Sequence, residues 1–239
     1  MDIALIGYGK MGKVIEQIAI SRGHQIVAKC NSQSPIEDLD FRKADIAIEF
    51  TTPDLAVKHI ECCINNNIPI VIGTTAWNDQ LPYVKEYVSK HNGALLHASN
   101  FSIGVNIFFD INRRLAKLME PHSSYDASIN ETHHLQKLDA PSGTAVTLAD
   151  DMLVENNNFS SWIHQKNEAP TVDKGQIDLT SYRAQDVPGT HVVQYNSEID
   201  SIELKHTAHN RTGFALGSII AAEWLIGKRG VYTMRDLIK

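Results

Sequence analysis

A glycine-rich turn lies between the first β-rich run and the first helical stretch of this chain. Gly7, Gly9 and Gly12 fit the spacing G-x-G-x-x-G directly after the apolar residues 3–6. Glycines at this spacing let the backbone turn tightly and approach a pyrophosphate, which then lies at the positive N-terminal end of the next helix. The pattern predicts a Rossmann-like domain that binds a dinucleotide, and a purely structural glycine turn is the alternative.

The first hundred residues alternate short β-rich runs with helical stretches. Strands are expected at residues 3–6, 25–29, 45–50, 69–73 and 94–98, and helices at 10–21, 54–66 and 80–91. This order favours a parallel sheet with crossover helices.

The pattern changes after residue 102. A helix is expected at 103–120, with Ile107, Phe108, Ile111, Leu115 and Leu118 as its core stripe. Further expected elements are a helix at 142–154, strands at 125–130, 177–184, 191–195 and 200–207, and a last helix at 214–226 that could return to either half. The fold class is therefore α/β: a parallel-sheet nucleotide domain plus an α+β domain with a mostly antiparallel sheet.

Composition excludes several classes of function. The net charge is -6, and no basic run exceeds two residues, so a general nucleic-acid binder is not expected. No apolar stretch is long enough to span a bilayer, and the N-terminus has no signal-peptide pattern, so the chain is expected to stay in the cytoplasm. Cys30, Cys62 and Cys63 fit neither a disulfide framework nor a zinc-ligand spacing, and no metal is expected.

The end of the second expected strand bears on the choice of cofactor. NAD-preferring sites place a carboxylate there, whereas this chain has Lys29, Asn31 and Ser32. Lys29 is cationic, and the other two can donate hydrogen bonds to a 2′-phosphate. NADPH is therefore the predicted cofactor, with NADH possible; a solvated strand end is the alternative for Lys29.

Hydroxyl and small residues follow two other expected strands. Phe50-Thr51 and Gly73-Thr74-Thr75 stand at carboxyl ends, where open α/β sheets bind ligands. Such residues leave room for a nicotinamide ring and offer hydrogen bonds to its amide.

Residues 131–144 concentrate titratable side chains: His133, His134 and Lys137. His133 and Lys137 would share one face of a helix, but Pro141 and the Ser-Gly after it favour a loop. The two side chains can converge in either conformation. This cluster suits an anionic substrate that must gain a proton, although histidines in a loop are often only surface or core groups.

The same segment ends in a predicted anion site. Ser142 is a good N-cap for the helix that follows, and the first turn of that helix has free backbone N–H groups. Such a turn binds anions.

With both clusters in view, the chain resembles the dihydrodipicolinate reductases, or 4-hydroxy-tetrahydrodipicolinate reductases, of the diaminopimelate and lysine pathway. The resemblance runs nearly end to end. It rests on Gly9-Lys10-Met11-Gly12, Phe50-Thr51, Gly73-Thr74-Thr75, Ala98 to Asn106 and, most specifically, Glu131 to Ala145, which is similar to E-x-H-H-x-x-K-x-D-A-P-S-G-T-A.

The resemblance implies NAD(P)H-dependent reduction of a small dicarboxylate, with His133 as acid/base and Lys137 as proton donor. The predicted substrate contacts are His134, Ser142, Gly143 and Thr144. The predicted cofactor contacts, with Lys29 and Phe50 included, are Gly7, Tyr8, Gly9, Lys10, Met11, Gly12, Lys29, Phe50, Gly73, Thr74, Thr75, Ala98, Ser99, Asn100 and Phe101. Many relatives have Arg-His where this chain has Leu135-Gln136, a difference that the resemblance places among the outer contacts.

The resemblance also implies a domain organisation. Residues 1–102 and 211–239 would form the dinucleotide-binding domain, and 103–210 the domain for substrate binding and oligomerisation. It further implies a homotetramer built through the second sheet, and hinges near Ser102 and Arg211.

Two rival functions remain open at the level of sequence. Another two-domain NAD(P) oxidoreductase, of the aspartate or homoserine dehydrogenase type, could have the same first hundred residues. A non-catalytic NADPH-sensing regulator could use the second domain to bind a partner, with structural histidines.

Overall fold

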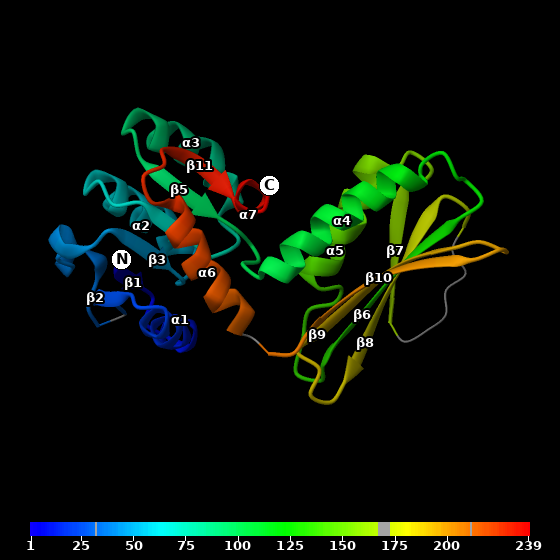
Figure 1. Cartoon of the computed structure of the whole chain (residues 1–239), viewed down its shortest axis with the longest axis horizontal. Coiled ribbons are helices and arrows are strands. Elements are labelled where there is room, and N and C mark those ends of the chain that lie inside the picture. Colours follow the sequence, from blue (N-terminus) through cyan, green and yellow to red (C-terminus); the bar gives the residue numbers. More distant parts are fainter. Residues whose placement is uncertain (32, 167–172, 211) are drawn as a thin grey trace. The chain divides into compact units, whose positions relative to one another are not determined.

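The computed structural model describes residues 1–31, 33–166, 173–210 and 212–239, which divide into two compact units (Figure 1). Unit 1 is Met1–Ile103 with Thr212–Lys239, and unit 2 is Gly104–Arg211. Ser32, a predicted phosphate contact, and Arg211, a predicted hinge residue, lie outside the described residues. The functions assigned to the two parts of the chain stay predictions.

Unit 1 is built on a six-stranded parallel sheet with the order β11-β5-β4-β3-β1-β2. Its strands are β1 (Asp2–Ile6), β2 (Gln25–Cys30), β3 (Ile46–Glu49), β4 (Ile70–Ile72), β5 (Ala94–His97) and β11 (Gly230–Thr233). The inner strands are almost wholly apolar because helices cover both faces of the sheet. The predicted fold class is confirmed here.

Helices pack on this sheet in two groups. They are α1 (Lys10–Ser21), α2 (Pro53–Asn65), α3 (Leu81–Lys90), α6 (Thr212–Leu225) and α7 (Met234–Leu237), with short 3₁₀ turns at Ile36–Asp38, Phe41–Lys43 and Asn78–Gln80. One core contains residues of α2 and α3, and the other contains residues of α1 and α6. Helix α6 packs so closely that a Cβ at Gly217 would lie 1.7 Å from the carbonyl oxygen of Phe101.

Unit 2 packs two helices, α4 (Ile103–Met119) and α5 (Gly143–Glu155), on one face of a five-stranded sheet (Figure 1). The strands β6 (Asp126–His134), β7 (Ser161–Lys166), β8 (Gln176–Ala184), β9 (Gly189–Asn196) and β10 (Ser201–Ala208) have the order β10-β9-β6-β8-β7. The pairs β6–β9 and β9–β10 are antiparallel, whereas β6–β8 and β7–β8 are parallel. The second sheet is thus mixed, and the sequence had shown neither β7 nor the last strand of unit 1.

The apolar stripe predicted for α4 is wrong in part. Phe108 is buried, but Ile107, Ile111 and Leu118 are 45%, 43% and 69% exposed. The core face is instead formed by Val105, Phe108, Phe109, Asn112, Ala116 and Met119. A small and a polar residue belong to this face because it packs closely on α5, where the Asn112 amide donates to the carbonyl of Leu148 at 3.0 Å.

In the part of the chain that the structure describes, no helix combines the length and the apolar character needed to cross a membrane.

Candidate active site

The glycine-rich turn joins β1 to α1, and two of its glycines are required by geometry. Gly7 has a φ of +100°, and a Cβ there would lie 2.0 Å from the carbonyl oxygen of Phe50. A Cβ on Gly12 would lie 2.5 Å from the carbonyl oxygen of Gly7. Gly9 is the N-cap of α1 and has no described atom within 4 Å of such a Cβ. No side chain at Gly9 covers the N–H groups of the first turn of α1, so an anion can come close to them.

A cavity of about 480 Å³ lies at this turn. The structure brings together here the ends of β1, β2 and β3, as the topology of a parallel sheet requires. Its lining is Gly7, Tyr8, Gly9, Cys30, Asn31, Pro35, Ile36, Glu37, Phe50, Thr51, Thr52, Leu55, Lys58 and His59. The cavity is the best candidate within unit 1 for a nucleotide.

The predicted nicotinamide contacts lie at the same carboxyl edge of the sheet. A Cβ on Gly73 would lie 2.1 Å from the Phe50 ring, and the hydroxyl of Thr74 accepts a hydrogen bond from the Thr51 N–H at 2.7 Å. Thr75 is exposed beside them. Residues 98–101 follow β5, where the Ala98 N–H donates to the carbonyl of Ile72 and the Asn100 side chain accepts from the Ser102 N–H. The Phe101 ring is buried against the Phe50 ring, at 5.8 Å between centroids.

Lys29 is not an isolated cation. Its ammonium lies 2.6 Å from a carboxylate oxygen of Glu16 and 4.3 Å from the centroid of the Tyr8 ring, and the Tyr8 hydroxyl donates to the same carboxylate. The hydrogen bond between Lys29 and Glu16 raises the pKa of Lys29 and lowers that of Glu16. Asn31 uses its side-chain oxygen to accept from the N–H groups of Gln33 and Ser34. A phosphate at Lys29 would therefore have to compete with Glu16.

Two groups of charged side chains near the cavity were missed by the sequence analysis. Glu37 and Lys58 form an ion pair, and both line the cavity. Glu49 is fully buried, accepts from the Thr51 hydroxyl and lies 3.2 Å from Nδ1 of His59. Only the three-dimensional arrangement joins these residues, since the 3₁₀ turn at Ile36–Asp38, β3, its following loop and α2 meet here.

In unit 2 the adjacent residues His133 and His134 lie on strand β6, so the predicted loop conformation is wrong for them. Strand β6 continues to His134 because it pairs with β8 through His134 and with β9 through Thr132. Successive side chains on a strand point to opposite faces. His133 thus shares the buried face with Glu131, and His134 lies on the other face, where its role stays a prediction.

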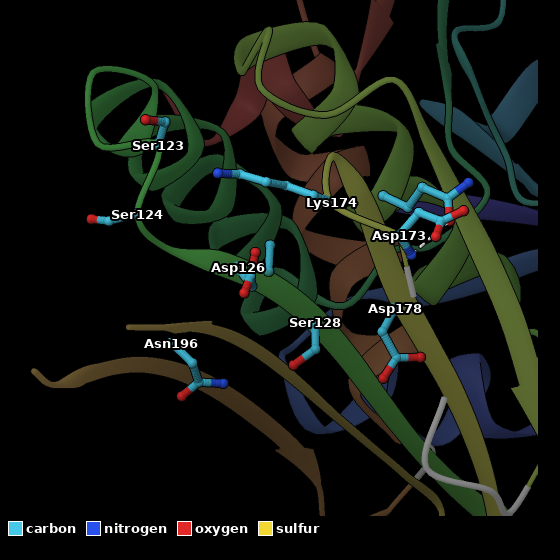
Figure 2. Close-up of a pocket in the computed structure, with 10 residues that line it drawn as sticks. Ser123, Ser124, Asp126, Ser128, Asp173, Lys174, Asp178 and Asn196 are labelled. Atoms are coloured by element: carbon cyan, nitrogen blue, oxygen red, sulfur yellow. Dashed lines mark hydrogen bonds between the residues drawn. The ribbon is translucent and has the colours of Figure 1, made fainter. Parts of the chain in front are cut away.

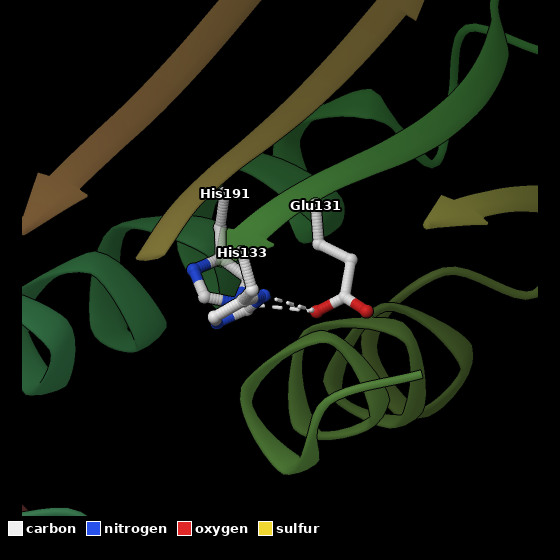
Figure 3. A group of neighbouring side chains, drawn as sticks. All are labelled: Glu131, His133 and His191. Carbon is white, nitrogen blue, oxygen red and sulfur yellow. Dashed lines mark ion pairs between the residues drawn. The ribbon is translucent and has the colours of Figure 1, made fainter. Parts of the chain in front are cut away.

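Glu131, His133 and His191 form a buried cluster on that inner face (Figure 3). Oε2 of Glu131 lies 3.2 Å from Nδ1 of His133 and 3.7 Å from Nε2 of His191. The other oxygen, Oε1, accepts from the Ser142 N–H at 3.0 Å and from the Ser181 hydroxyl at 2.6 Å. Burial alone would raise the pKa of Glu131, but hydrogen bonds from His133, Ser142 and Ser181 lower it, so the carboxyl is ionised.

The start of α5 joins this cluster. Ser142 is the N-cap, and its hydroxyl accepts from the Ala145 N–H at 3.2 Å and lies 3.0 Å from Nε2 of His191. Gly143 is exposed and Thr144 is partly exposed, so the first turn of α5 faces open space beside the acid–base groups. This arrangement agrees with the predicted anion site.

Lys137 lies on the loop between β6 and α5, as predicted. Its ammonium is 2.6 Å from a carboxylate oxygen of Asp139, and this hydrogen bond lowers the pKa of Asp139. Arg183, on β8, holds the loop by donating to the backbone carbonyls of Lys137 and Asp139 at 3.3 and 2.7 Å. Its guanidinium also lies 3.7 Å from Oε1 of Glu131.

Glu131, Ser181, Arg183 and His191 were not among the predicted site residues. Glu131 belongs to the quoted motif, and only its motif position could have drawn attention to it. The others stand 50 or more positions farther along the chain, and strand pairing brings them to β6: Ser181 and Arg183 stand beside Glu131 and His133 on β8, and His191 stands opposite Glu131 on β9.

Unit 2 has a cavity of about 550 Å³ at the start of β6, the end of that strand away from His133 (Figure 2). Its lining includes the carboxylates of Asp126, Asp173 and Asp178 and one cation, Lys174. Carboxylates repel a dianionic substrate, so this cavity does not suit one.

Comparison with known proteins agrees with this arrangement. Residues 1–101 match the family described as "Dihydrodipicolinate reductase, N-terminus", and residues 104–238 match "Dihydrodipicolinate reductase, C-terminus". The chain belongs to the dihydrodipicolinate reductase family. The predicted family and enzyme class, an NAD(P)H-dependent oxidoreductase, are confirmed.

Individual members of the family match over their whole length. The 4-hydroxy-tetrahydrodipicolinate reductase of Christiangramia forsetii is 46% identical, covering 100% of this chain and 98% of the relative. That of Thermosipho africanus is 33% identical, with 100% and 98% covered.

Solved structures show the same fold. Dipicolinate-bound dihydrodipicolinate reductase from Paenisporosarcina sp. TG-14 matches with a TM-score of 0.77 at 24% identity, covering 99% of each chain. An amine dehydrogenase from Mycobacterium smegmatis has a TM-score of 0.65 at 11% identity, with 99% of this chain and 95% of that chain covered. An enzyme with a different name thus shares this architecture. The fold alone does not identify the reaction, so the reaction has to be argued from the site residues.

Proposed function

We propose that this protein reduces 4-hydroxy-tetrahydrodipicolinate to tetrahydrodipicolinate with NAD(P)H, a step of diaminopimelate and L-lysine biosynthesis. The relatives are named for this reaction. The observation that carries the proposal is the buried Glu131–His133 pair, which adjoins the free end of α5 and the loop of Lys137. An acid–base group, an ammonium and an anion site thus come from one short segment.

The substrate is a small ring with two carboxylates, and unit 2 offers two ways to hold one. The N–H groups of Gly143 and Thr144, with the Thr144 hydroxyl, bind one carboxylate at the start of α5. Lys137 binds a carboxylate through a charge-assisted hydrogen bond, in place of its exposed partner Asp139. His134 and Ser142 complete the proposed contacts.

NAD(P)H supplies a hydride to the unsaturated ring that remains when the 4-hydroxyl group leaves as water. The ring carbon next to the new C–H bond then takes a proton. Lys137 donates this proton from its ammonium, and His133 stabilises or relays it. A positioned proton transfer of this kind contributes about 10²–10⁴ in rate.

In unit 1, the N–H groups at the start of α1 hold the pyrophosphate, and Phe50, Gly73–Thr75 and residues 98–101 surround the nicotinamide. NADPH is used at least as well as NADH, because no carboxylate directly follows β2. Lys29 contacts the 2′-phosphate by leaving Glu16, and Lys58 on the cavity wall offers a second cation.

The protein acts in the cytoplasm as a homotetramer assembled through the sheet of unit 2. The support for this assembly is that α4 and α5 lie on one face of the sheet, while the alternate side chains of β6 and β9 on the other face are only partly buried (Figure 1). A face of this kind is available to pair with another copy.

Steady-state turnover tests the proposal, with substrate generated in situ from its precursors and the oxidation of NADPH and of NADH followed in parallel. We expect turnover with at least one cofactor that depends on the substrate. A protein that binds NADPH but does not turn over would favour the regulator, and turnover with aspartate semialdehyde or aspartate instead would favour another oxidoreductase.

A further inference from the structure

The geometry points to Glu131 as a positioning residue that fixes the tautomer of His133, with Nδ1 protonated and Nε2 left to exchange the proton of the reaction. This inference rests on the proposed function of His133. Glu131 does not touch the substrate in this scheme. It acts by holding one nitrogen of the imidazole.

The two carboxylate oxygens of Glu131 have different neighbours. Oε1 is occupied, because the Ser142 N–H and the Ser181 hydroxyl both donate to it. Oε2 faces the two imidazoles, with Nδ1 of His133 at the shorter distance of 3.2 Å. An unprotonated Nδ1 at this distance would place a lone pair against the carboxylate, whereas a protonated one is attracted to it, so the charge of Oε2 favours the proton on Nδ1.

His191 is the other imidazole beside Oε2. Nε2 of His191 lies 3.0 Å from the Ser142 hydroxyl but 3.7 Å from Oε2 of Glu131. Its hydrogen-bond partner is therefore Ser142, and it makes no hydrogen bond with Oε2. Burial, and then the nearby His133, lower the pKa of His191 to about 3. His191 is therefore neutral, and His133 is the donor to Glu131.

The second ring nitrogen of His133, Nε2, lies beside Gly189 on β9. A Cβ on Gly189 would lie 3.0 Å from Nε2 and 3.3 Å from Cδ2 of this ring. Glycine at this position keeps a side chain away from that edge of the imidazole. Because Nδ1 is buried beside Glu131, Nε2 is the nitrogen left to exchange the proton in this scheme.

The charged and titratable groups around His133 come from three strands. Glu131 is on the same strand, Arg183 is on β8 and His191 is on β9, with its ring centroid 5.1 Å away. His206 and Lys137 also act on His191 by repulsion. Of these groups, only Glu131 offers a negative charge at the ring, so it alone favours the proton on Nδ1.

The test is ¹⁵N NMR of the histidine rings in the full-length protein, which identifies the tautomer without any turnover. We expect His133 of the wild type in the Nδ1–H form and that of Glu131→Gln in the Nε2–H form, because the amide oxygen keeps the Ser142 and Ser181 bonds while its NH₂ turns to Nδ1. The Nε2–H form in the wild type, or no change in the variant, would overturn the inference. This outcome is independent of whether the proposed reaction occurs.

Kinetics adds a second readout. Glu131→Gln should lower kcat by about 10- to 100-fold, part of the about 10²–10⁴ available from positioned proton transfer, with KM little changed and the pH profile of kcat shifted. Glu131→Asp should recover part of the loss. The matched control is Ser181→Ala, which removes a bond to Oε1 but leaves Oε2 alone, and equal effects of the two changes would show a merely structural role.

The same three side chains could offer ligand atoms to a metal ion, since these atoms lie within 4.8 Å of one another. Two histidines and one carboxylate are a common zinc set. In the scheme proposed here a proton, and not a metal ion, lies between Oε2 of Glu131 and Nδ1 of His133. The enzyme should therefore stay active after chelation and should not require zinc. Loss of activity on chelation, with recovery only on adding zinc, would replace the tautomer scheme with a metal site.

Discussion

The two units hold their candidate sites in different ways. In unit 1 the cofactor cavity is formed largely by backbone and by small residues at the ends of neighbouring strands, and Gly7 and Gly12 are required because a Cβ would overlap main-chain oxygens. In unit 2 the site is formed by side chains from β6, β8, β9 and the start of α5, which hold one another through a buried carboxylate. The first kind of site depends on shape and the second on a hydrogen-bond network, so substitutions should act differently on them.

Lys137→Ala should have the largest effect on the reaction. It removes both a charge partner of the bound substrate and the proton donor, so kcat should fall by about 10²–10⁴ and KM should rise. NADPH affinity should not change, because Lys137 belongs to unit 2. The control is Lys174→Ala in the acidic cavity, which should turn over as the wild type does. Near-normal turnover of folded Lys137→Ala would defeat the mechanism.

Gly7→Ala should damage unit 1 through backbone geometry. The residue would have to keep a φ of +100°, which costs about 1–3 kcal/mol, and its Cβ would overlap the Phe50 carbonyl. We expect a lower Tm and loss of NADPH binding, measured by thermal unfolding and by fluorescence titration. Gly9→Ala, which meets no described atom, should cost less than about 1 kcal/mol. An equal fall in Tm in the two variants would contradict the shape argument.

Acid should destabilise unit 2 through His191. Burial, and then His133, lower its pKa from 6.5 to about 3, so between these values the unfolded chain binds a proton that the folded chain does not. Stability therefore falls as the pH drops below 6.5. Glu131, whose pKa is also lowered, adds a loss of the same sign only near and below 4.5, its ordinary value.

The window from pH 6.5 to about 5 thus isolates the histidines. In urea unfolding across it, His191→Gln should lose stability less steeply than the wild type. Some slope should remain, because burial also lowers the pKa values of His97 and His206. His122→Gln, an exposed histidine, should keep the wild-type slope. An unchanged slope in His191→Gln would show that His191 is protonated in the folded state.

Glu16→Gln should have the smallest effect, and it acts only on cofactor choice. Releasing Lys29 from its ion pair should lower KM for NADPH by about two- to fivefold, the range of an exposed ion pair worth under about 1 kcal/mol, and leave KM for NADH unchanged. Glu61→Gln is the matched control, because Glu61 also accepts from a tyrosine but lies outside the cavity. Equal changes in KM for NADPH and for NADH would show that Lys29 does not contact the 2′-phosphate.

The sequence predicts most of unit 1 because the signals there are local. Helix α1 has the predicted bounds Lys10–Ser21, and the five strands predicted there differ from the structure by at most one residue at either end. The apolar runs of a parallel sheet and the glycine spacing are visible without knowing which residues meet. What is missed in unit 1, such as Glu49 beside His59, depends on contact between elements.

Unit 2 is less predictable because its strands depend on distant partners. Strand β6 continues past Asn130 through polar residues that read as a loop, since pairing with β8 and β9 supplies their hydrogen bonds. The positions of Glu131, His133, Lys137 and Ser142 follow from one motif, but the other neighbours of this cluster, Ser181, Arg183 and His191, come from distant strands. Sequence alone does not show which of many distant serines and histidines a buried carboxylate meets.

The insertion of unit 2 within unit 1 sets an order for folding during synthesis. All residues of unit 2 have left the ribosome before α6 and β11, so the inserted unit can close its sheet while the one that encloses it is still incomplete. Until α6 arrives, the place of Gly217 against Phe101 is empty and the apolar face formed by β3, β4 and β5 is uncovered. The nascent chain is therefore most exposed to aggregation and to chaperones through its first hundred or so residues, the part that was made first.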